Sequence, residues 1–417
     1  MNHFIQSEIE ISASDRQKIR ALAGRTAELA ARDEEQNKQS LWRRHNALEQ
    51  TRPLIFCDPE NGWNEIIPEE SMECTGKLAR EWEMYLRKEI FWGEKMRDDR
   101  VVVSYFKIRH AALDSGWGVD IRRVGGLDGG SYIVDPPIKT LDDVSRLKFP
   151  QITADWNSTN RLLDLADSTF GDLMPVKLHT DWWWTLGLTY ELMHLRGLER
   201  MMLDMVEQPE IIHKIMSILR DGTTAKLDYL EANGLLCLNN SGDYVGSGGF
   251  GWSDELPQPD FSGQVRTIDM WGFAESQETV SVSPTMFEEF VFQYQLPILS
   301  RFGLNCYGCC EPLDKRIHII KRIPRLRRIS VSPWSNIEIM ASELGADYIF
   351  SMKPNPADLA APVFDEDRIR RELRKAIETA RGCRMEIIMK DCHTINHDPN
   401  RVIRWTRIAI EEAERAA

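Results

Sequence analysis

The chain has 417 residues, of which 42% are hydrophobic, so it is long enough for one large α/β domain with an added helical region. Its formal net charge is −13 and its pI is about 5.3, which excludes a general nucleic-acid surface, since binding phosphates needs clustered Lys and Arg. No segment approaches the roughly 18 apolar residues of a membrane span.

The first residues, MNHFIQSEIEIS, lack the basic start and the apolar stretch of a secretory signal. We therefore expect a cytoplasmic protein that contacts neither membrane nor nucleic acid. The eight cysteines follow no small-scaffold disulfide spacing, so we expect reduced thiols.

Residues 1–95 are predicted to form a mostly helical N-terminal cap or arm. Between residues 15 and 48, apolar residues recur at helical spacing among many charges. This arm is also the expected contact of a homodimer. Residues 52–70, RPLIFCDPENGWNEIIPEE, are punctuated by Pro and Gly and are predicted to be irregular.

Residues 96–417 show a strand-then-helix rhythm. Eight short apolar runs occupy residues 100–106, 175–179, 234–240, 267–273, 302–307, 326–332, 346–352 and 384–390. Helices are predicted between the later runs, for example at 283–302 after a Ser-Pro start and at 365–382 before a final Gly. Eight such units predict a (β/α)8 TIM barrel, with a doubly wound open sheet as the alternative, because periodicity does not separate the two.

The stretch GSGGFG at 246–251 has the G-x-G-x-x-G spacing of a dinucleotide-binding loop. That function requires a helix to begin directly after the loop, and the next residues, WSDELPQPD, do not begin one. We therefore expect a flexible loop near the mouth of the barrel.

In a TIM barrel the active site lies where the strands end and the loops begin. His179 ends one predicted strand and is a catalytic candidate. The next residues include three consecutive tryptophans, of which Trp183 and Trp184 are predicted to form an aromatic wall against a flat substrate. The alternative is that they pack the following helix against the barrel. Asn240 and Trp334 follow two further strands and are predicted to contact the substrate.

Sulfur is concentrated at two further strand ends. Cys309 and Cys310 end the fifth strand, and Cys392 and His393 end the eighth, so their side chains are expected to converge across the mouth. Two thiolates with a histidine or a carboxylate suit zinc, and Glu275, at a third strand end, is the candidate carboxylate.

Other interpretations of these residues stay open. The cysteines are equally explained as small buried side chains at strand ends, and a redox disulfide is a third possibility. Glu275 is also a candidate substrate contact or general base, and a hydrogen-bonded loop acid is the alternative.

The chain resembles the uroporphyrinogen decarboxylase superfamily over roughly residues 100–417, and within it the corrinoid-dependent methyltransferase branch. Four stretches carry the resemblance in this order: PVKLHTDWWWTLGLTYELMHLRGLERMMLDMVEQPEII, FAESQETVSVSPTMFEEFVFQYQLPIL, LNCYGCCEPLD and KDCHTI. It is clearest in the Leu- and Met-rich helix at 197–209 and in the turn SPTMFEEF at 283–290.

Within the superfamily, the resemblance favours methyl transfer over porphyrinogen decarboxylation. The true decarboxylases carry an arginine-rich substrate loop, and the corresponding residues here, RPLIFCDPENGWNEIIP, lack those basic side chains. The zinc methyltransferases carry His-x-Cys at one strand end and a Cys at the last. These positions fall on Tyr307, Cys309 and Cys392, so tyrosine replaces the histidine ligand.

The resemblance implies an O-demethylase type of methyltransferase. Such an enzyme moves a methyl group from a small methylated compound, here expected to be a methoxylated aromatic, to the cobalt of cobalamin on a separate corrinoid protein. A proton donor or Lewis acid is needed at the leaving oxygen, and Tyr307, His393 or a bound metal is expected to supply it. The alternatives are a lyase acting on a smaller carboxylic acid and a non-catalytic protein that binds a corrinoid or tetrapyrrole.

Overall fold

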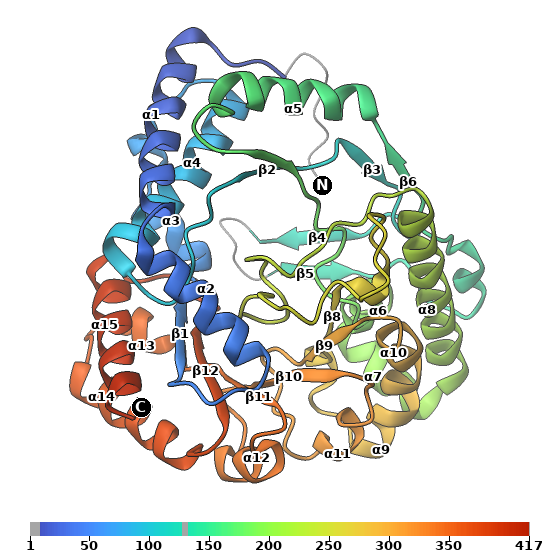
Figure 1. The fold of residues 1–417 in the computed structure, drawn as a ribbon. Coiled ribbons are helices and arrows are strands. Elements are labelled where there is room, and N and C mark those ends of the chain that lie inside the picture. Colours follow the sequence, from blue (N-terminus) through green and yellow to red (C-terminus); the bar gives the residue numbers. More distant parts are fainter. Residues whose placement is uncertain (1–8, 127–131, 417) are drawn as a thin grey trace.

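The computed structural model describes residues 9–126 and 132–416 and shows a mixed α/β fold. A central sheet of six parallel strands has the order β1-β12-β11-β10-β9-β8 and is surrounded by helices (Figure 1). These strands are β1 (Leu54–Cys57), β8 (Trp271–Ala274), β9 (Leu304–Tyr307), β10 (Leu326–Val331), β11 (Ile349–Met352) and β12 (Arg384–Met389).

Six further strands form three pairs. The parallel pair is β2 (Phe106–Ile108) with β7 (Val176–Leu178). The antiparallel pairs are β3 (Ala112–Asp114) with β6 (Ile152–Ala154), and β4 (Arg122–Gly125) with β5 (Tyr132–Asp135).

The helices lie mainly outside the sheet. In Figure 1, α14 and α15 cover one end of it, and α8 and α10 cover the other. The helices are α1 (Ala13–Ala30), α2 (Asp33–Asn46), α3 (Trp63–Ile66), α4 (Lys77–Phe91), α5 (Trp156–Phe170), α6 (Thr189–Arg196), α7 (Leu198–Glu207), α8 (Pro209–Ala232), α9 (Pro284–Phe287), α10 (Gln293–Leu299), α11 (Ile317–Ile320), α12 (Ile337–Leu344), α13 (Ala357–Ala360), α14 (Glu366–Thr379) and α15 (Asn400–Arg415). None of the helices in the described part of the chain has the length and apolar character that a membrane crossing needs.

The strands of the central sheet are short, apolar and buried on both faces. Every residue of β1, β8 and β9 is buried. Unbroken burial is typical of parallel strands that helices or loops cover on both sides. β2 and β7 form a separate parallel pair beside the six-stranded sheet. Across the described residues no ladder joins β1 to β2 or β7 to β8, so closure into the expected barrel stays a prediction.

Three predictions about the strands are wrong. The run 100–106 is not a strand up to residue 105, because β2 begins only at Phe106. The segment 52–70, expected to be irregular, contains β1, which pairs in parallel with β12 from Leu54 to Cys57. The run 234–240 forms no strand. Instead, the Asn239 side chain accepts a hydrogen bond from the Trp271 N–H at 2.9 Å and donates one to the Trp271 carbonyl at 3.0 Å. The Asn239 side chain therefore makes the two hydrogen bonds to the Trp271 backbone that a neighbouring strand would otherwise make.

The glycine-rich loop at 246–251 is buried against the sheet, contrary to the expectation of a flexible loop near the mouth. Gly248 and Gly249 have φ values of 97° and 87°, a region that favours glycine. A Cβ atom at Gly248 would lie 2.5 Å from the Ile388 side chain, and one at Gly249 would lie 2.9 Å from the Arg328 guanidinium. The absence of side chains therefore lets this loop fill the space over β10 and β12.

A buried ionic network lies beneath this loop. The Arg328 Nε atom on β10 is 2.9 Å from Glu386 Oε1 on β12, and Arg328 also donates to the Asn46 side-chain oxygen at 2.7 Å. The His45 Nε2 atom is 3.2 Å from Glu386 Oε2. Burial raises the pKa of Glu386, but the charges of Arg328 and His45 outweigh burial and lower it to about 2. The network therefore ties the end of α2 to the sheet.

We predict that Glu386→Gln lowers the free energy of unfolding by about 3–5 kcal/mol, because it leaves the Arg328 guanidinium buried without its countercharge. Urea denaturation followed by circular dichroism measures this change. The matched control is Arg322→Met, which breaks the exposed ion pair with Glu288 and should change the unfolding free energy by less than about 1 kcal/mol. Equal effects of the two substitutions would contradict the prediction.

Candidate functional site

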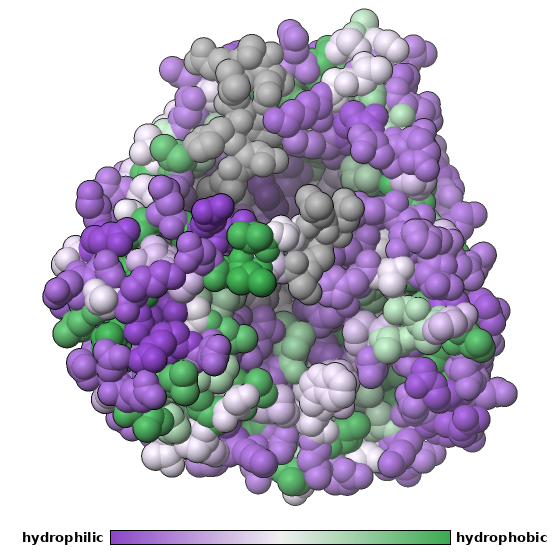
Figure 2. All heavy atoms as spheres, turned by 180° about the vertical axis from the view of Figure 1, so that it is seen from behind, coloured by the Kyte–Doolittle hydropathy of each residue, from purple (hydrophilic) through white to green (hydrophobic). Residues whose placement is uncertain are grey.

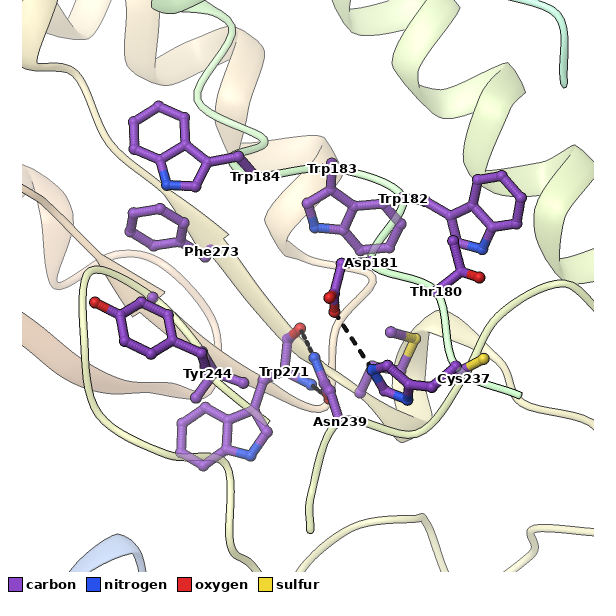
Figure 3. A pocket seen from close by; sticks show the side chains of 14 residues that line it. Thr180, Asp181, Trp182, Trp183, Trp184, Cys237, Asn239, Tyr244, Trp271 and Phe273 are labelled. Carbon is purple, nitrogen blue, oxygen red and sulfur yellow. Dashed lines mark hydrogen bonds and ion pairs between the residues drawn. The ribbon is translucent and has the colours of Figure 1, made fainter. Parts of the chain in front are cut away.

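An aromatic cavity of about 320 Å³ lies beside the residues that follow β7 (Figure 3). The loop at 237–246 and the first part of β8 form its other walls. Six aromatic side chains line it: Trp182, Trp183, Trp184, Tyr244, Trp271 and Phe273. Its polar lining residues include His179, Asp181 and Asn239. The cavity thus offers apolar ring surfaces with polar groups at one end.

The three consecutive tryptophans hold different positions around this cavity. Trp182 is buried, and its indole N–H donates to the Leu235 carbonyl at 2.8 Å, which anchors the segment. Trp183 packs edge-on against Phe302. The Trp184 side chain is 50% exposed and packs edge-on against Phe273. The structure therefore places Trp183 and Trp184 on the cavity wall.

His179 is paired with two carboxylates at the polar end of the cavity. Its Nε2 atom is 3.0 Å from Asp243 Oδ1 and 3.4 Å from Asp181 Oδ1. Burial lowers the pKa of His179, but the hydrogen bonds to Asp181 and Asp243 outweigh it, so the pKa lies above 6.5. A histidine of raised pKa beside an apolar cavity is suited to donate a proton to a bound ligand.

Asp243 also follows a predicted strand, but sequence reasoning did not predict its pairing with His179. It is buried and also forms an ion pair with Lys107. Burial raises its pKa, but the hydrogen bond from His179 and the charge of Lys107 lower it to about 2. Asp243 therefore stays ionised beside the imidazole. No sequence spacing relates Asp243 to His179. The two meet because the segment that holds Asp243 is packed in place by the glycine-rich loop, whose Gly251 N–H donates to the Asp243 carbonyl.

A wider groove of about 1050 Å³ follows β8, β9 and β10. Its lining includes Cys310, Glu311 and Trp334 from the loops after β9 and β10, together with Tyr132 from β5. The Trp334 side chain is 70% exposed. The face shown in Figure 2 is mostly hydrophilic and has a hollow near its centre.

A row of rings connects the aromatic cavity to the groove. Trp184, on the cavity wall, packs against Tyr190, which in turn packs against His194. The His194 Nε2 atom lies 3.0 Å from the hydroxyl of Tyr132 on the groove wall. A chain of ring contacts therefore runs from the wall of the cavity to the wall of the groove.

The residues predicted to bind zinc are not brought together. The Cys309 sulfur lies beside Ser247, Cys310 and Lys390. The Cys392 thiol is buried and donates to the Lys390 carbonyl at 3.6 Å. In the described residues, no three His, Cys, Asp or Glu side chains form a group that could hold a metal ion. The donor set as arranged does not fit zinc, and we derive no chemical step through it.

Glu275 is buried under the strand ends and lines neither hollow. Its Oε2 atom accepts the Gln277 N–H at 2.9 Å, and its Oε1 atom has no hydrogen-bond partner among the described residues. Burial raises the pKa of Glu275 well above its usual range, and the neighbouring carboxylates of Glu278 and Glu311 raise it further. Burial and these neighbours therefore favour the protonated form of Glu275.

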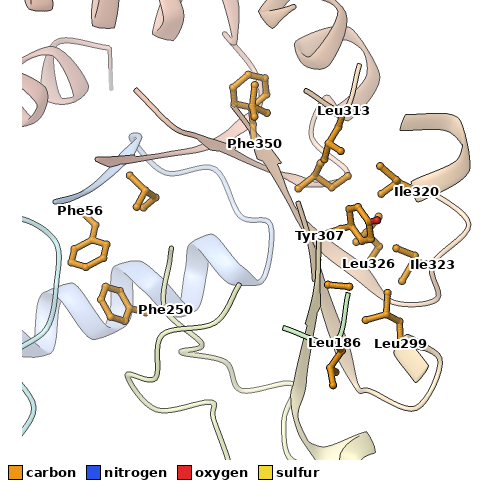
Figure 4. Close-up of a cluster of buried hydrophobic side chains, with 14 of the residues drawn as sticks. Phe56, Leu186, Phe250, Leu299, Tyr307, Leu313, Ile320, Ile323, Leu326 and Phe350 are labelled. Atoms are coloured by element: carbon orange, nitrogen blue, oxygen red, sulfur yellow. The ribbon is translucent and has the colours of Figure 1, made fainter. Parts of the chain in front are cut away.

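The remaining candidates lie away from the aromatic cavity. Tyr307 is buried in the hydrophobic cluster of Figure 4, where its hydroxyl donates to the Gln295 side chain at 2.8 Å. His393 is exposed beside Asn61. The Asn240 side chain donates to backbone carbonyls at 253 and 256 and so stabilises its own loop. None of the three lines the cavity.

The parallel sheet and the surrounding helices define a mixed α/β fold with hollows near the strand ends. No protein-family model and no curated protein sequence matches the chain. Among solved structures, the fold is similar to that of a methyltransferase from Methanosarcina mazei, with a TM-score of 0.50 and 11% sequence identity. The similarity covers 90% of this chain and 97% of that chain, and at this identity it shows the fold alone.

We predict that Asp243→Asn lowers the pKa of His179. Burial already lowers this pKa, and the substitution leaves only the longer contact with Asp181 to oppose it. NMR titration of selectively labelled histidine measures the midpoint, and the spectrum of His179→Gln assigns the signal. Asp254→Asn, which removes an exposed carboxylate paired with Arg43, is the control and should leave the midpoint unchanged. An unchanged midpoint in Asp243→Asn would disprove the pairing.

Proposed function

We propose that the protein is a methyltransferase that removes the methyl group of a small methoxylated aromatic compound and passes it to the cobalt of a separate corrinoid protein. The observation that carries the proposal is the aromatic cavity with a histidine of raised pKa at its polar end. The fold shared with a methyltransferase gives further support.

The cavity suits one flat ring. Its volume of about 320 Å³ is at the small end of ligand pockets. Trp183, Trp184, Phe273 and Tyr244 offer ring faces and edges, which favour offset-stacked or edge-to-face contacts with an aromatic ligand. A ligand ring held there also excludes water from the bond to be broken.

The leaving group explains the need for His179. When a methyl group is taken from an aryl methyl ether, the bond between the methyl carbon and oxygen breaks, and the oxygen keeps the electron pair. The cobalt(I) of the corrinoid supplies the nucleophile. The protonated imidazole of His179 supplies the proton that turns the departing phenolate into a phenol, and Asp243 stabilises the charged imidazole beforehand.

The corrinoid protein is the expected partner at the wider groove. This groove is connected to the cavity by the chain of ring contacts, and its exposed Trp334 side chain offers an apolar contact. Zinc has no role in the proposal, because the predicted ligands Cys309, Cys392 and Glu275 do not converge.

We predict that purified protein, mixed with a reduced corrinoid protein and a methoxylated aromatic compound, forms methylcobalamin, which visible absorbance measures. His179→Gln should lower the rate by about 10²–10⁴-fold, because it removes the general acid. His213→Gln is the matched control, since this histidine lies on α8 and contacts Tyr294 outside the cavity. Failure to methylate cobalt with any methoxylated aromatic would overturn the proposed reaction.

We predict that the rate falls as pH rises through the pKa of His179, which lies above 6.5, because only the protonated imidazole donates. In Asp243→Asn this fall should move to lower pH, in step with the lowered pKa. The rate of methylcobalamin formation is measured from pH 5 to 9 in both proteins, with a readout that does not itself vary with pH. The pH at which the rate falls is then compared between them. A fall at the same pH in both proteins would assign the proton to another group.

A further inference from the structure

Two thiols lie side by side where β9 ends. The chain bends at Gly308, whose φ is 92°, and its N–H donates to the Ala274 carbonyl at 2.9 Å. A Cβ atom at this position would lie 2.5 Å from the Leu313 side chain, so the bend requires glycine. The bend brings the sulfur atoms of Cys309 and Cys310 to 3.6 Å from each other.

Polar groups surround this pair of sulfurs. The Ser247 hydroxyl donates to the Cys309 sulfur at 3.1 Å, and the Lys390 ammonium lies 3.8 Å from it. The Cys310 thiol donates to Asp391 Oδ2 at 3.0 Å. The cation and the hydroxyl donor stabilise negative charge on the Cys309 sulfur, which suits Cys309 to attack an electrophilic sulfur on Cys310, while the Asp391 carboxylate is placed to accept the Cys310 proton.

The two thiols differ in access. Cys309 is buried, with 2% of its surface exposed. Cys310 is partly exposed and lines the wide groove. A small reagent in the groove therefore meets Cys310 first and finds the second sulfur directly behind it. A second step, between the two sulfurs, therefore needs no other thiol to reach the site.

We infer that Cys309 and Cys310 form a site of reversible oxidation by hydroperoxides. The thiol of Cys310 reacts with a hydroperoxide, ROOH, to give a sulfenic acid and the alcohol ROH. The Cys309 sulfur then attacks the sulfenic sulfur, so that a sulfur–sulfur bond forms and water leaves with the Cys309 proton. In total, two thiols lose two electrons and two protons, and the hydroperoxide gains them.

Oxidation changes contacts on both sides of the pair. The Cys310 thiol loses the proton that it donates to Asp391, and the Cys309 sulfur becomes a weaker acceptor for Ser247. Ser247 follows directly after Tyr244–Gly246, which line the aromatic cavity. A disulfide between adjacent residues is strained and is readily reduced again. The inference needs no methyl-transfer activity, so it stands or fails apart from the proposed function.

The test treats the reduced full-length protein with a small excess of hydrogen peroxide. The remaining thiols are then blocked with iodoacetamide, and the tryptic peptide 302–315 is weighed. This peptide also holds Cys306, which is buried beside Arg328. After peroxide, we expect the peptide to be two hydrogens lighter and to carry one blocked cysteine. If dithiothreitol is added before the blocking step, all three cysteines should be blocked.

Single substitutions identify the paired sulfurs. Cys309→Ser and Cys310→Ser should each abolish the two-hydrogen loss, and Cys306→Ser should leave it unchanged. Cys237 is the matched internal reference, because it is also partly exposed but contacts only backbone carbonyls, and its peptide should stay unoxidised. Three blocked cysteines after peroxide, or a disulfide that persists in Cys310→Ser, would overturn the inference.

Discussion

The ion pair between Arg328 and Glu386 holds the centre of this molecule together. It joins β10 to β12 across β11, and Asn46 from α2 completes it. Arg328 and Asn46 also donate to the Phe250 carbonyl, at 3.4 and 2.8 Å, so the glycine-rich loop is bound to the same network. A buried ionic network of this kind adds little net stability, but breaking it is costly, and it favours a single arrangement of its partners.

That arrangement matters because one short segment, residues 243–250, serves both the aromatic cavity and the thiol pair. From its fixed end at Phe250, this segment brings Asp243 to His179, Tyr244 to the aromatic wall and Ser247 to the Cys309 sulfur. A loop held only at the surface would not keep a carboxylate 3.0 Å from an imidazole. The acid function and the thiol pair therefore depend on a core interaction that touches neither of them.

Local sequence patterns predicted much of the fold and part of the site. The apolar runs correctly predicted the places of β7, β9, β10, β11 and β12. His179, Trp183 and Trp184 were chosen as candidates because they follow a predicted strand, and all three line the aromatic cavity. The prediction missed β1, because four apolar residues between Pro and Gly resemble a loop. It also missed the pairing of Asp243 with His179, because nothing in the local sequence records the partners of a segment that packs against distant strands. Tyr307 ended a strand as expected, but its side chain faces the helices, since alternate residues of a strand point to opposite faces.

The sequence distance between the partners of α2 has a consequence for synthesis of the protein. His45 is made 341 residues before its partner Glu386, and Asn46 is made 282 residues before its partner Arg328. Until then, the imidazole, the amide and the glycine-rich loop have no native ionic partners. Native contacts of such long range slow folding, and the unfinished chain exposes apolar strands meanwhile. The segment from Arg328 to Glu386 thus decides when the end of α2 reaches its native contacts.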